Sequence, residues 1–315
     1  MAAIELDGVT KRFGDVTAVD GLDLTVAEGE VFGFLGPNGA GKSTTINVLL
    51  DFVRPTEGSV RVLGMDPQRE SVAVRERTGV LPEGFSVYDR LTGHEHLEFA
   101  IESKDADADP DALLERVGLA GDGDRKAGGY SKGMAQRLAL GMALVGDPDL
   151  LILDEPSSGL DPAGAKEMRE IVREEADRGA TVFFSSHVLG QVEAVCDSVG
   201  ILREGKLVAR DSIRGLREAV GTGATLEITA EGVTDDQLDA VRDLDGVDAA
   251  TTDGTVVTVQ CDPEAKTAVI GTLEDAGVVV DDFATRESSL EDLFLAYTEG
   301  DAPGASEAAD SEVEA

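Results

Sequence analysis

The sequence predicts an α/β fold in which helices cover a mostly parallel sheet, joined by antiparallel strands at the N-terminus and a small α+β domain at the C-terminus. Short, fully apolar runs alternate with longer helical patterns through the first two thirds of the chain, as in a parallel sheet. Residues 3–9 and 22–26 instead alternate apolar with polar side chains, which is typical of half-buried antiparallel strands. Beyond residue 215 the pattern changes to a βαββαβ order.

A glycine-rich loop follows the apolar run 31–35 and opens a helical pattern over 44–52. The loop fits G-x-x-x-x-G-K-[ST] without a mismatch, with the residues Gly36, Pro37, Asn38, Gly39, Ala40, Gly41, Lys42 and Ser43, followed by Thr44. Glycines allow backbone N–H groups to face phosphate oxygens, and the helix N-terminus adds a positive partial charge. We expect Lys42 to reach the outer phosphates and Ser43 to ligate Mg²⁺. The motif and its context predict a P-loop NTPase core.

Two acidic residues, Asp154 and Glu155, end the next apolar run at 150–153. A further apolar run at 181–184 leads into His187. Ligands of parallel sheets bind at the carboxyl ends of strands, where all of these residues should meet. We expect Asp154 to hold Mg²⁺ and Glu155 to polarise an attacking water.

Residues 86–146 are predicted to form a largely helical subdomain inserted into the sheet domain, which spans residues 1–215. Thr92 and Glu95 have the spacing of a capping box, and 111–117 forms a second helical pattern. His94 and His96 lie two apart, on different faces of the predicted helix, and a metal site would favour a spacing of four. Both are therefore expected to be surface residues.

Residues 222–298 form the predicted accessory domain, whose βαββαβ order indicates a ferredoxin-like fold. Asp253 and Gly254 form the turn of a predicted hairpin, and Pro263 is expected to start a helix. A capping box at 288–291 predicts a closing helix, and the acidic tail 301–315 is predicted to be disordered.

The formal net charge is −36, from 63 acidic and 27 basic residues. Such a charge disfavours binding to nucleic acids and to anionic lipids. A globular chain this acidic resembles the proteins of salt-accumulating halophiles, although an ordinary acidic protein remains an alternative. No apolar run approaches the roughly 18 residues that span a bilayer, and no signal peptide is evident, so a cytoplasmic protein is expected. Cys196 and Cys261 are expected to be buried free thiols.

Further motifs, in order along the chain, resemble those of the ATP-binding subunits of ABC transporters. Tyr-Ser-Lys-Gly-Met-Ala-Gln-Arg at 130–137 resembles the family's signature motif, and Ser-Gly-Leu-Asp at 158–161 resembles its D-loop. His187 matches the switch histidine, and Phe13 matches the aromatic residue that stacks on adenine. Glu83 stands where the family has the Q-loop glutamine.

The resemblance implies an ABC ATPase fold and a site shared between two subunits. Ser131 and Gly133, at a helix N-terminus, would face the γ-phosphate of ATP bound to the opposite subunit, with Asp161 close by. His187 would contact the γ-phosphate, and Glu83 would ligate Mg²⁺ in place of the usual amide. Lys132 and Met134 depart from the usual Gly and Gln of the signature motif.

Leu-Pro-Glu at 81–83, the signature motif and Ser-Leu-Glu-Asp-Leu-Phe at 289–294 resemble the drug- and antibiotic-resistance branch that serves ABC-2-type permeases. The resemblance implies an ATPase that uses ATP and Mg²⁺. Its partners would be a second ATPase subunit, identical or paired, and a separate integral-membrane permease for export, on the inner face of the cell membrane. Two alternatives stay open, a soluble ABC ATPase acting on ribosomes or DNA and a regulatory nucleotide sensor.

Overall fold

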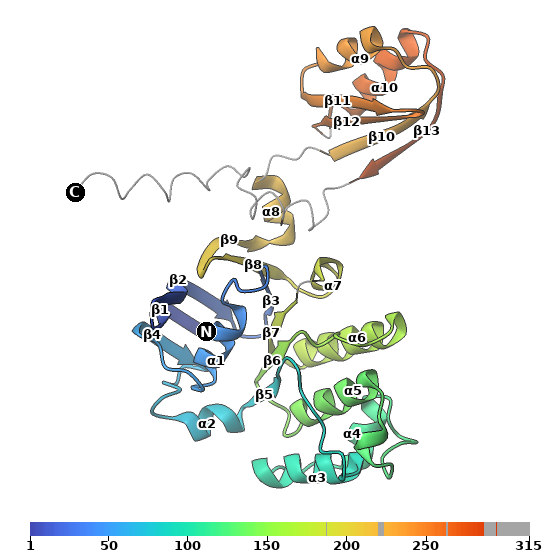
Figure 1. Ribbon diagram of the computed structural model, residues 1–315. Helices are drawn as coiled ribbons and strands as arrows, with labels where there is room; N and C mark the ends of the chain where they lie inside the picture. The colour runs from blue at the N-terminus through green and yellow to red at the C-terminus, as the bar shows by residue number, and fades with distance from the viewer. Residues whose placement is uncertain (187, 220–223, 263, 287–293, 295–315) are drawn as a thin grey trace, which may run out of the picture. The chain divides into compact units, whose positions relative to one another are not determined.

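The computed structural model describes residues 1–186, 188–219, 224–262, 264–286 and 294 (Figure 1). The chain divides into two compact units, Met1–Ser212 and a second unit that begins at Ile213. The capping box predicted at 288–291 and the acidic tail at 301–315 lie outside the described residues.

The centre of the first unit is a six-stranded sheet in the order β5-β6-β7-β3-β8-β9. Its strands are β3 (Val31–Leu35), β5 (Thr78–Leu81), β6 (Leu150–Asp154), β7 (Thr181–Ser185), β8 (Ser198–Arg203) and β9 (Lys206–Ser212). Neighbouring strands from β5 to β8 are parallel, and only β9 runs antiparallel to its neighbour. Because β6, β7 and β3 are adjacent, the ends of these three strands meet at one edge of the sheet.

A second, three-stranded antiparallel sheet has the order β2-β1-β4. It is formed by β1 (Ala2–Phe13), β2 (Val16–Ala27) and β4 (Glu57–Val62). Leu22, Leu24 and Val26 are buried while their neighbours face solvent, as the alternation in the sequence predicts.

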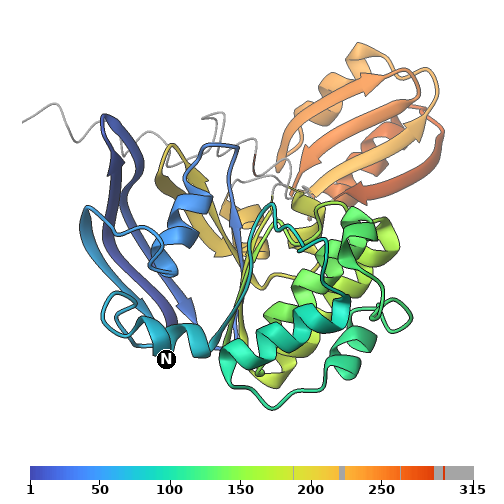
Figure 2. The same ribbon diagram turned by 60° about the horizontal axis from the view of Figure 1, so that its bottom comes forward.

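Helices cover both faces of the large sheet. The helices of the first unit are α1 (Lys42–Leu49), α2 (Ser71–Glu76), α3 (Gly93–Lys104), α4 (Pro110–Arg116), α5 (Lys132–Ala143), α6 (Pro162–Arg178) and α7 (Leu189–Glu193), with a short 3-10 helix η1 (Ala127–Gly129). Helix α1 and the three-stranded sheet lie on one side, and α5 and α6 lie on the other (Figures 1 and 2). Phe183 of β7 packs against Phe32 and Phe34 of β3, with ring centroids 5.8 and 5.1 Å apart, in the core that joins the two sheets.

The helical subdomain between β5 and β6 begins as predicted but buries one histidine. The capping box of Thr92 and Glu95 is present at the start of α3. His94 forms ion pairs with Asp111 and Asp124, at 2.6 and 3.3 Å. The prediction that His96 is a surface residue is wrong, since only 1% of it is exposed.

Local hydrogen bonds explain the burial of His96. Its Nδ1 lies 2.7 Å from the Thr92 carbonyl oxygen, and its Nε2 accepts from the Tyr88 N–H at 2.9 Å. The Tyr88 ring stacks on the imidazole at a centroid distance of 5.9 Å. The loop that precedes α3 therefore folds back over the helix, and satisfied hydrogen bonds make a buried imidazole tolerable.

The second unit has the order β10-α9-β11-β12-α10-β13, preceded by α8 (Ile213–Ala219). The bounds are β10 (Ala224–Ala230), α9 (Asp235–Arg242), β11 (Val247–Asp253), β12 (Val256–Cys261), α10 (Lys266–Asp275) and β13 (Val280–Arg286). The sheet order β11-β12-β10-β13, antiparallel throughout, is that of a ferredoxin-like fold. Gly254 makes the predicted hairpin turn with φ of 66°, whereas Pro263 lies outside the described residues.

Leu238 and Val241 of α9 and Val269 and Leu273 of α10 share one core cluster with the buried face of this sheet. Cys196 and Cys261 are both buried and unbridged, as expected. In the part of the chain that the structure describes, no helix has both the length and the apolar character that a membrane span needs.

Candidate ATP site

The phosphate loop joins the end of β3 to the start of α1, and close backbone packing shapes it. Gly41 precedes α1 with φ of 111°, and a Cβ there would lie 2.4 Å from the Ala18 carbonyl oxygen. A Cβ on Gly36 would lie 2.5 Å from the carbonyl oxygen of Leu202. Because only glycine fits at both places, the loop curls tightly and its N–H groups become available to an anion.

Lys42 is 8% exposed and lies inside this loop. Its Nζ donates to the carbonyl oxygen of Gly36 at 2.6 Å and lies 3.4 Å from that of Pro37. Neutral carbonyl oxygens are weaker partners for an ammonium group than the charged oxygens of a phosphate. The side chain is therefore placed to exchange these contacts for a phosphate group.

Asp154 is the last residue of β6 and Glu155 follows it; they are 5% and 8% exposed. Ser185 of β7, the register partner of Asp154, donates its hydroxyl to the Asp154 carboxylate. The Ser186 hydroxyl lies 3.5 Å from Oε2 of Glu155. Glu155 has a left-handed backbone with φ of 51°, a costly conformation for a residue that is not glycine.

Burial is the main cause that raises the pKa of Asp154. The hydrogen bond from Ser185 acts in the opposite direction, while the charges of Glu83 and Glu155 raise the pKa further and the Lys42 ammonium lowers it. Three carboxylates around one ammonium group leave an excess of negative charge. A divalent cation with a preference for oxygen ligands would offset it, so the donor set fits Mg²⁺.

An open pocket of about 390 Å³ brings these groups together. Its lining comes from the phosphate loop, the start of α1 and two strand ends, and consists of Ala18, Asn38, Gly39, Gly41, Lys42, Ser43, Thr44, Glu83, Asp154 and Glu155. Glycine amides and an ammonium group, together with carboxylates and the Ser43 hydroxyl, suit a polyphosphate that carries Mg²⁺.

The signature residues lie at the start of α5, outside the lining of this pocket among the described residues. Ser131 caps α5, and its Oγ accepts from the Met134 N–H at 3.2 Å. Gly133 packs against the D-loop, since a Cβ there would lie 3.2 Å from the Gly159 carbonyl oxygen. Asp161 caps α6 by accepting from the Gly164 N–H at 2.8 Å. Within one chain, the signature motif and the D-loop thus form a second cluster.

Phe13, singled out in the sequence as an adenine-stacking residue, does not line the pocket among the described residues. Phe13 ends β1 and is 49% exposed, with Nζ of Lys11 4.8 Å from its ring centroid. An exposed ring of this kind is available for stacking. His187 lies outside the described residues.

Ser185, Ser186, Gln136 and Ala18 are residues of the site for which the sequence motifs indicate no individual role. Ser185 ends β7 and Ser186 follows it, so the rule that polar residues at strand ends line the site could have found them. Nε2 of Gln136 lies 3.0 Å from the Pro156 carbonyl oxygen, and no local sequence pattern predicts this contact.

Comparisons with known proteins agree with this geometry. A family model described as ABC transporter matches residues 19–158. The daunorubicin resistance ATP-binding protein DrrA3 of Streptomyces coeruleorubidus is 36% identical over 305 residues, which cover 95% of this chain and 96% of that protein. The bacitracin transport ATP-binding protein BcrA of Bacillus licheniformis is 41% identical over 211 residues, covering 65% of this chain and 68% of that protein.

A solved structure of the ATP-binding subunit of an ABC transporter matches with a TM-score of 0.64 and 28% identity, over 69% of this chain and 92% of that chain. The matched share agrees with the extent of the first unit. Since the likeness to DrrA3 extends over nearly the whole of both proteins, this chain belongs to the ATP-binding subunits of ABC transporters, which bind ATP with Mg²⁺ and hydrolyse it.

Proposed function

We propose that this chain powers a separate membrane permease of the ABC-2 type, in the export of an antibiotic-like or drug-like substrate, from the inner face of the cell membrane. The observation that carries the proposal is the pocket in which Lys42, Asp154 and Glu155 meet, beyond the carboxyl ends of β3 and β6, the two strands that flank β7. Two relatives are named for daunorubicin resistance and for bacitracin transport, which favours this substrate class.

The pocket supports a division of labour among its residues. Lys42 moves from the Gly36 carbonyl to the outer phosphates of ATP, and the glycine amides of the loop hold the inner ones. Ser43, Asp154 and Glu83 would hold Mg²⁺, which when bound offsets charge on the phosphate oxygens. Glu155 accepts the proton of the attacking water.

Two chains are needed for a complete site in this proposal. Ser131 and Gly133 at the N-terminus of α5 lie in a different cluster from Lys42, so they are free to meet ATP held by a second ATPase subunit. Asp161 would line the same subunit boundary. His187 would orient the attacking water, and Phe13 would stack on adenine.

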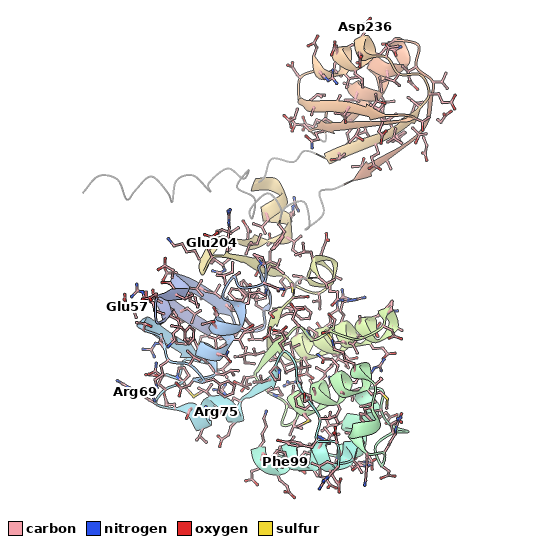
Figure 3. The ribbon with its side chains drawn as sticks, viewed as in Figure 1. Glu57, Arg69, Arg75, Phe99, Glu204 and Asp236 are labelled. Carbon is pink, nitrogen blue, oxygen red and sulfur yellow. The ribbon has the colours of Figure 1, made fainter. Side chains whose placement is uncertain are left out.

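The permease would dock where large apolar side chains are exposed around α2 and α3. These residues are Phe52, Val72, Tyr88 and Phe99. Arg75 of α2 lies over the ring of Phe52, at 5.6 Å from its centroid. Figure 3 shows Arg75 and Phe99 on helices at the same end of the unit. Exposed aromatic groups of this kind are typical of protein interfaces.

The test is a tagged chain purified from detergent-solubilised membranes of its own cells. The expected partner is an integral membrane protein with about six spans, and Phe99→Asp should remove it while ATP binding persists. Phe283→Asp, which changes a phenylalanine that is 56% exposed on β13 of the second unit, is the matched control and should retain the partner. Co-sedimentation with ribosomes and no membrane partner would favour the soluble alternative instead.

The acidic composition supports a second, independent proposal, that the protein needs high salt to fold. With 63 acidic and 27 basic residues, self-repulsion is strong unless it is screened. At about 1 M salt the Debye length is about 3 Å, which removes most of the repulsion. Full stability after refolding in low salt would contradict this proposal.

A further inference from the structure

The start of helix α5 lies against the loop that follows Asp154 and Glu155. Lys132 and Gln136 are four residues apart, so both point from one face of the helix. Across from them lies the segment from Glu155 to Ser158, which closes with a hydrogen bond from the Ser158 N–H to the Glu155 carbonyl oxygen at 3.0 Å. The signature helix therefore touches the segment that carries the proposed general base.

Gln136 holds the first part of this segment. Its Nε2 lies 3.0 Å from the Pro156 carbonyl oxygen and 3.3 Å from that of Glu155. Both partners are acceptors, so the side-chain nitrogen, and not the oxygen, must face them. On the other side, the Glu155 N–H donates to the Ser185 carbonyl oxygen at 3.1 Å. Hydrogen bonds on both sides thus hold a left-handed residue, whose conformation would otherwise relax.

Lys132 holds the end of the segment. Its Nζ donates to the Ser158 hydroxyl at 3.0 Å. Its aliphatic stem crosses Gly159, where a Cβ would lie 2.5 Å from Lys132 Cδ. Although the chain carries a net charge of −36, Lys132 forms no ion pair within the described residues. Among the described residues, the ammonium group therefore bonds to the D-loop hydroxyl of Ser158 and not to a carboxylate.

We propose that Lys132 and Gln136 are positioning residues that fix the backbone of Glu155, so that the orientation of its carboxylate follows the position of α5. The inference rests on the proposed role of Glu155 as general base. Movement of the signature helix, when a second subunit closes on it, would then be transmitted to the base through these two side chains.

Gln136→Met keeps the length of the side chain and removes its donors. The expected result is a fall in kcat of roughly 5- to 30-fold, because a misdirected base costs about the free energy of one or two hydrogen bonds. KM for ATP and Tm should stay unchanged. Gln68→Met, on the exposed surface, is the matched control and should keep the kcat of the wild type.

Lys132→Met should lower kcat by about 2- to 5-fold, the effect of one exposed hydrogen bond. Lys132→Arg, which can still donate to Ser158, should restore most of the activity. Combining Lys132→Met with Ser158→Ala should cost no more than either change alone, since both remove the same contact. Lys166→Met, at a lysine that is 71% exposed on α6, is the control.

A double variant decides whether Gln136 acts through Glu155. In the Glu155→Gln background, Gln136→Met should reduce the residual activity no further, because the base is already absent. If Gln136→Met lowers kcat by the same factor in the Glu155→Gln background as in the wild type, or lowers Tm on its own, the contact is only structural and the inference is overturned. Wild-type ATPase activity in Glu155→Gln alone would instead overturn the proposed role of Glu155.

Discussion

Lys42 lies folded onto its own loop, with its ammonium nitrogen 2.6 Å from the carbonyl oxygen of Gly36. Because the side chain is already buried and hydrogen-bonded, binding of a phosphate exchanges one set of partners for a more strongly charged one. The pocket is thus ordered around the position that the phosphates would take.

Lys42→Met should leave the fold intact and remove the ammonium that faces the phosphates. The expected result is a kcat lower by roughly 10²- to 10³-fold, as for other preorganised electrostatic donors. Steady-state ATP hydrolysis measures kcat, and titration with a fluorescent nucleotide measures the nucleotide affinity. Unchanged nucleotide affinity together with unchanged kcat would contradict the assignment of the loop.

Gly41→Ala should displace the loop, because the new Cβ would meet the Ala18 carbonyl oxygen at 2.4 Å and the residue holds φ of 111°. Strain of about 1–3 kcal/mol predicts an ATP affinity roughly 10-fold lower or worse. Gly190→Ala is the control, since nothing lies within 4 Å of its Cβ. That change should raise stability by about 0.5–1 kcal/mol, measured by urea denaturation.

Glu175 is 1% exposed and joins two arginines, Arg116 of α4 at 2.7 Å and Arg178 of α6 at 2.5 Å. Glu175→Ala should lower the free energy of unfolding by about 3 kcal/mol, because it leaves two guanidinium groups without their buried partner. Glu174→Ala, next to it and 63% exposed, is the control and should cost less than about 0.5 kcal/mol. Equal losses in the two variants would show that burial of the pair is unimportant.

His94 predicts a pH dependence of stability. The hydrogen bond to Asp111 is the largest cause that raises its pKa above 6.5, and the Asp111 and Asp124 charges act in the same direction. A raised pKa means that the folded state binds the proton more tightly. The stabilisation is therefore complete below pH 6.5 and is lost as the pH rises through the raised pKa.

The difference in Tm between the wild type and His94→Gln should accordingly be largest in mildly acidic buffer and shrink towards alkaline pH. Asp111→Asn should remove most of the low-pH gain and change little at high pH. A Tm difference that stays constant across the pH range would refute the role of the charged pair.

Much of the fold could be predicted from the sequence because its signals are local. The alternation of Leu22, Leu24 and Val26, the capping box at Thr92 and Glu95, and the Asp253–Gly254 turn each depend on residues within a few positions. The phosphate loop is local as well. These elements appear with their predicted type, and differ mainly in where they begin and end.

The contacts that organise the site could not be predicted in this way. Ser185 meets Asp154 only because β7 pairs with β6, and Gln136 meets Pro156 across twenty residues of sequence. His96 is buried because the loop around Tyr88 folds back over α3. Helical periodicity describes the faces of one helix and does not predict how a neighbouring loop packs on it. Sheet order and loop packing, and not local preference, decide these positions.

In the proposed mechanism two copies, or two paired subunits, close over ATP, and Glu155 then accepts a proton from the water that attacks it. The most direct measurement is the molar mass of Glu155→Gln in solution by light scattering, with and without Mg-ATP. We expect a monomer without nucleotide and a stable dimer with Mg-ATP, together with a kcat lower by roughly 10²- to 10⁴-fold. A variant that stays monomeric in saturating Mg-ATP, or that hydrolyses ATP at the wild-type rate, would contradict this mechanism.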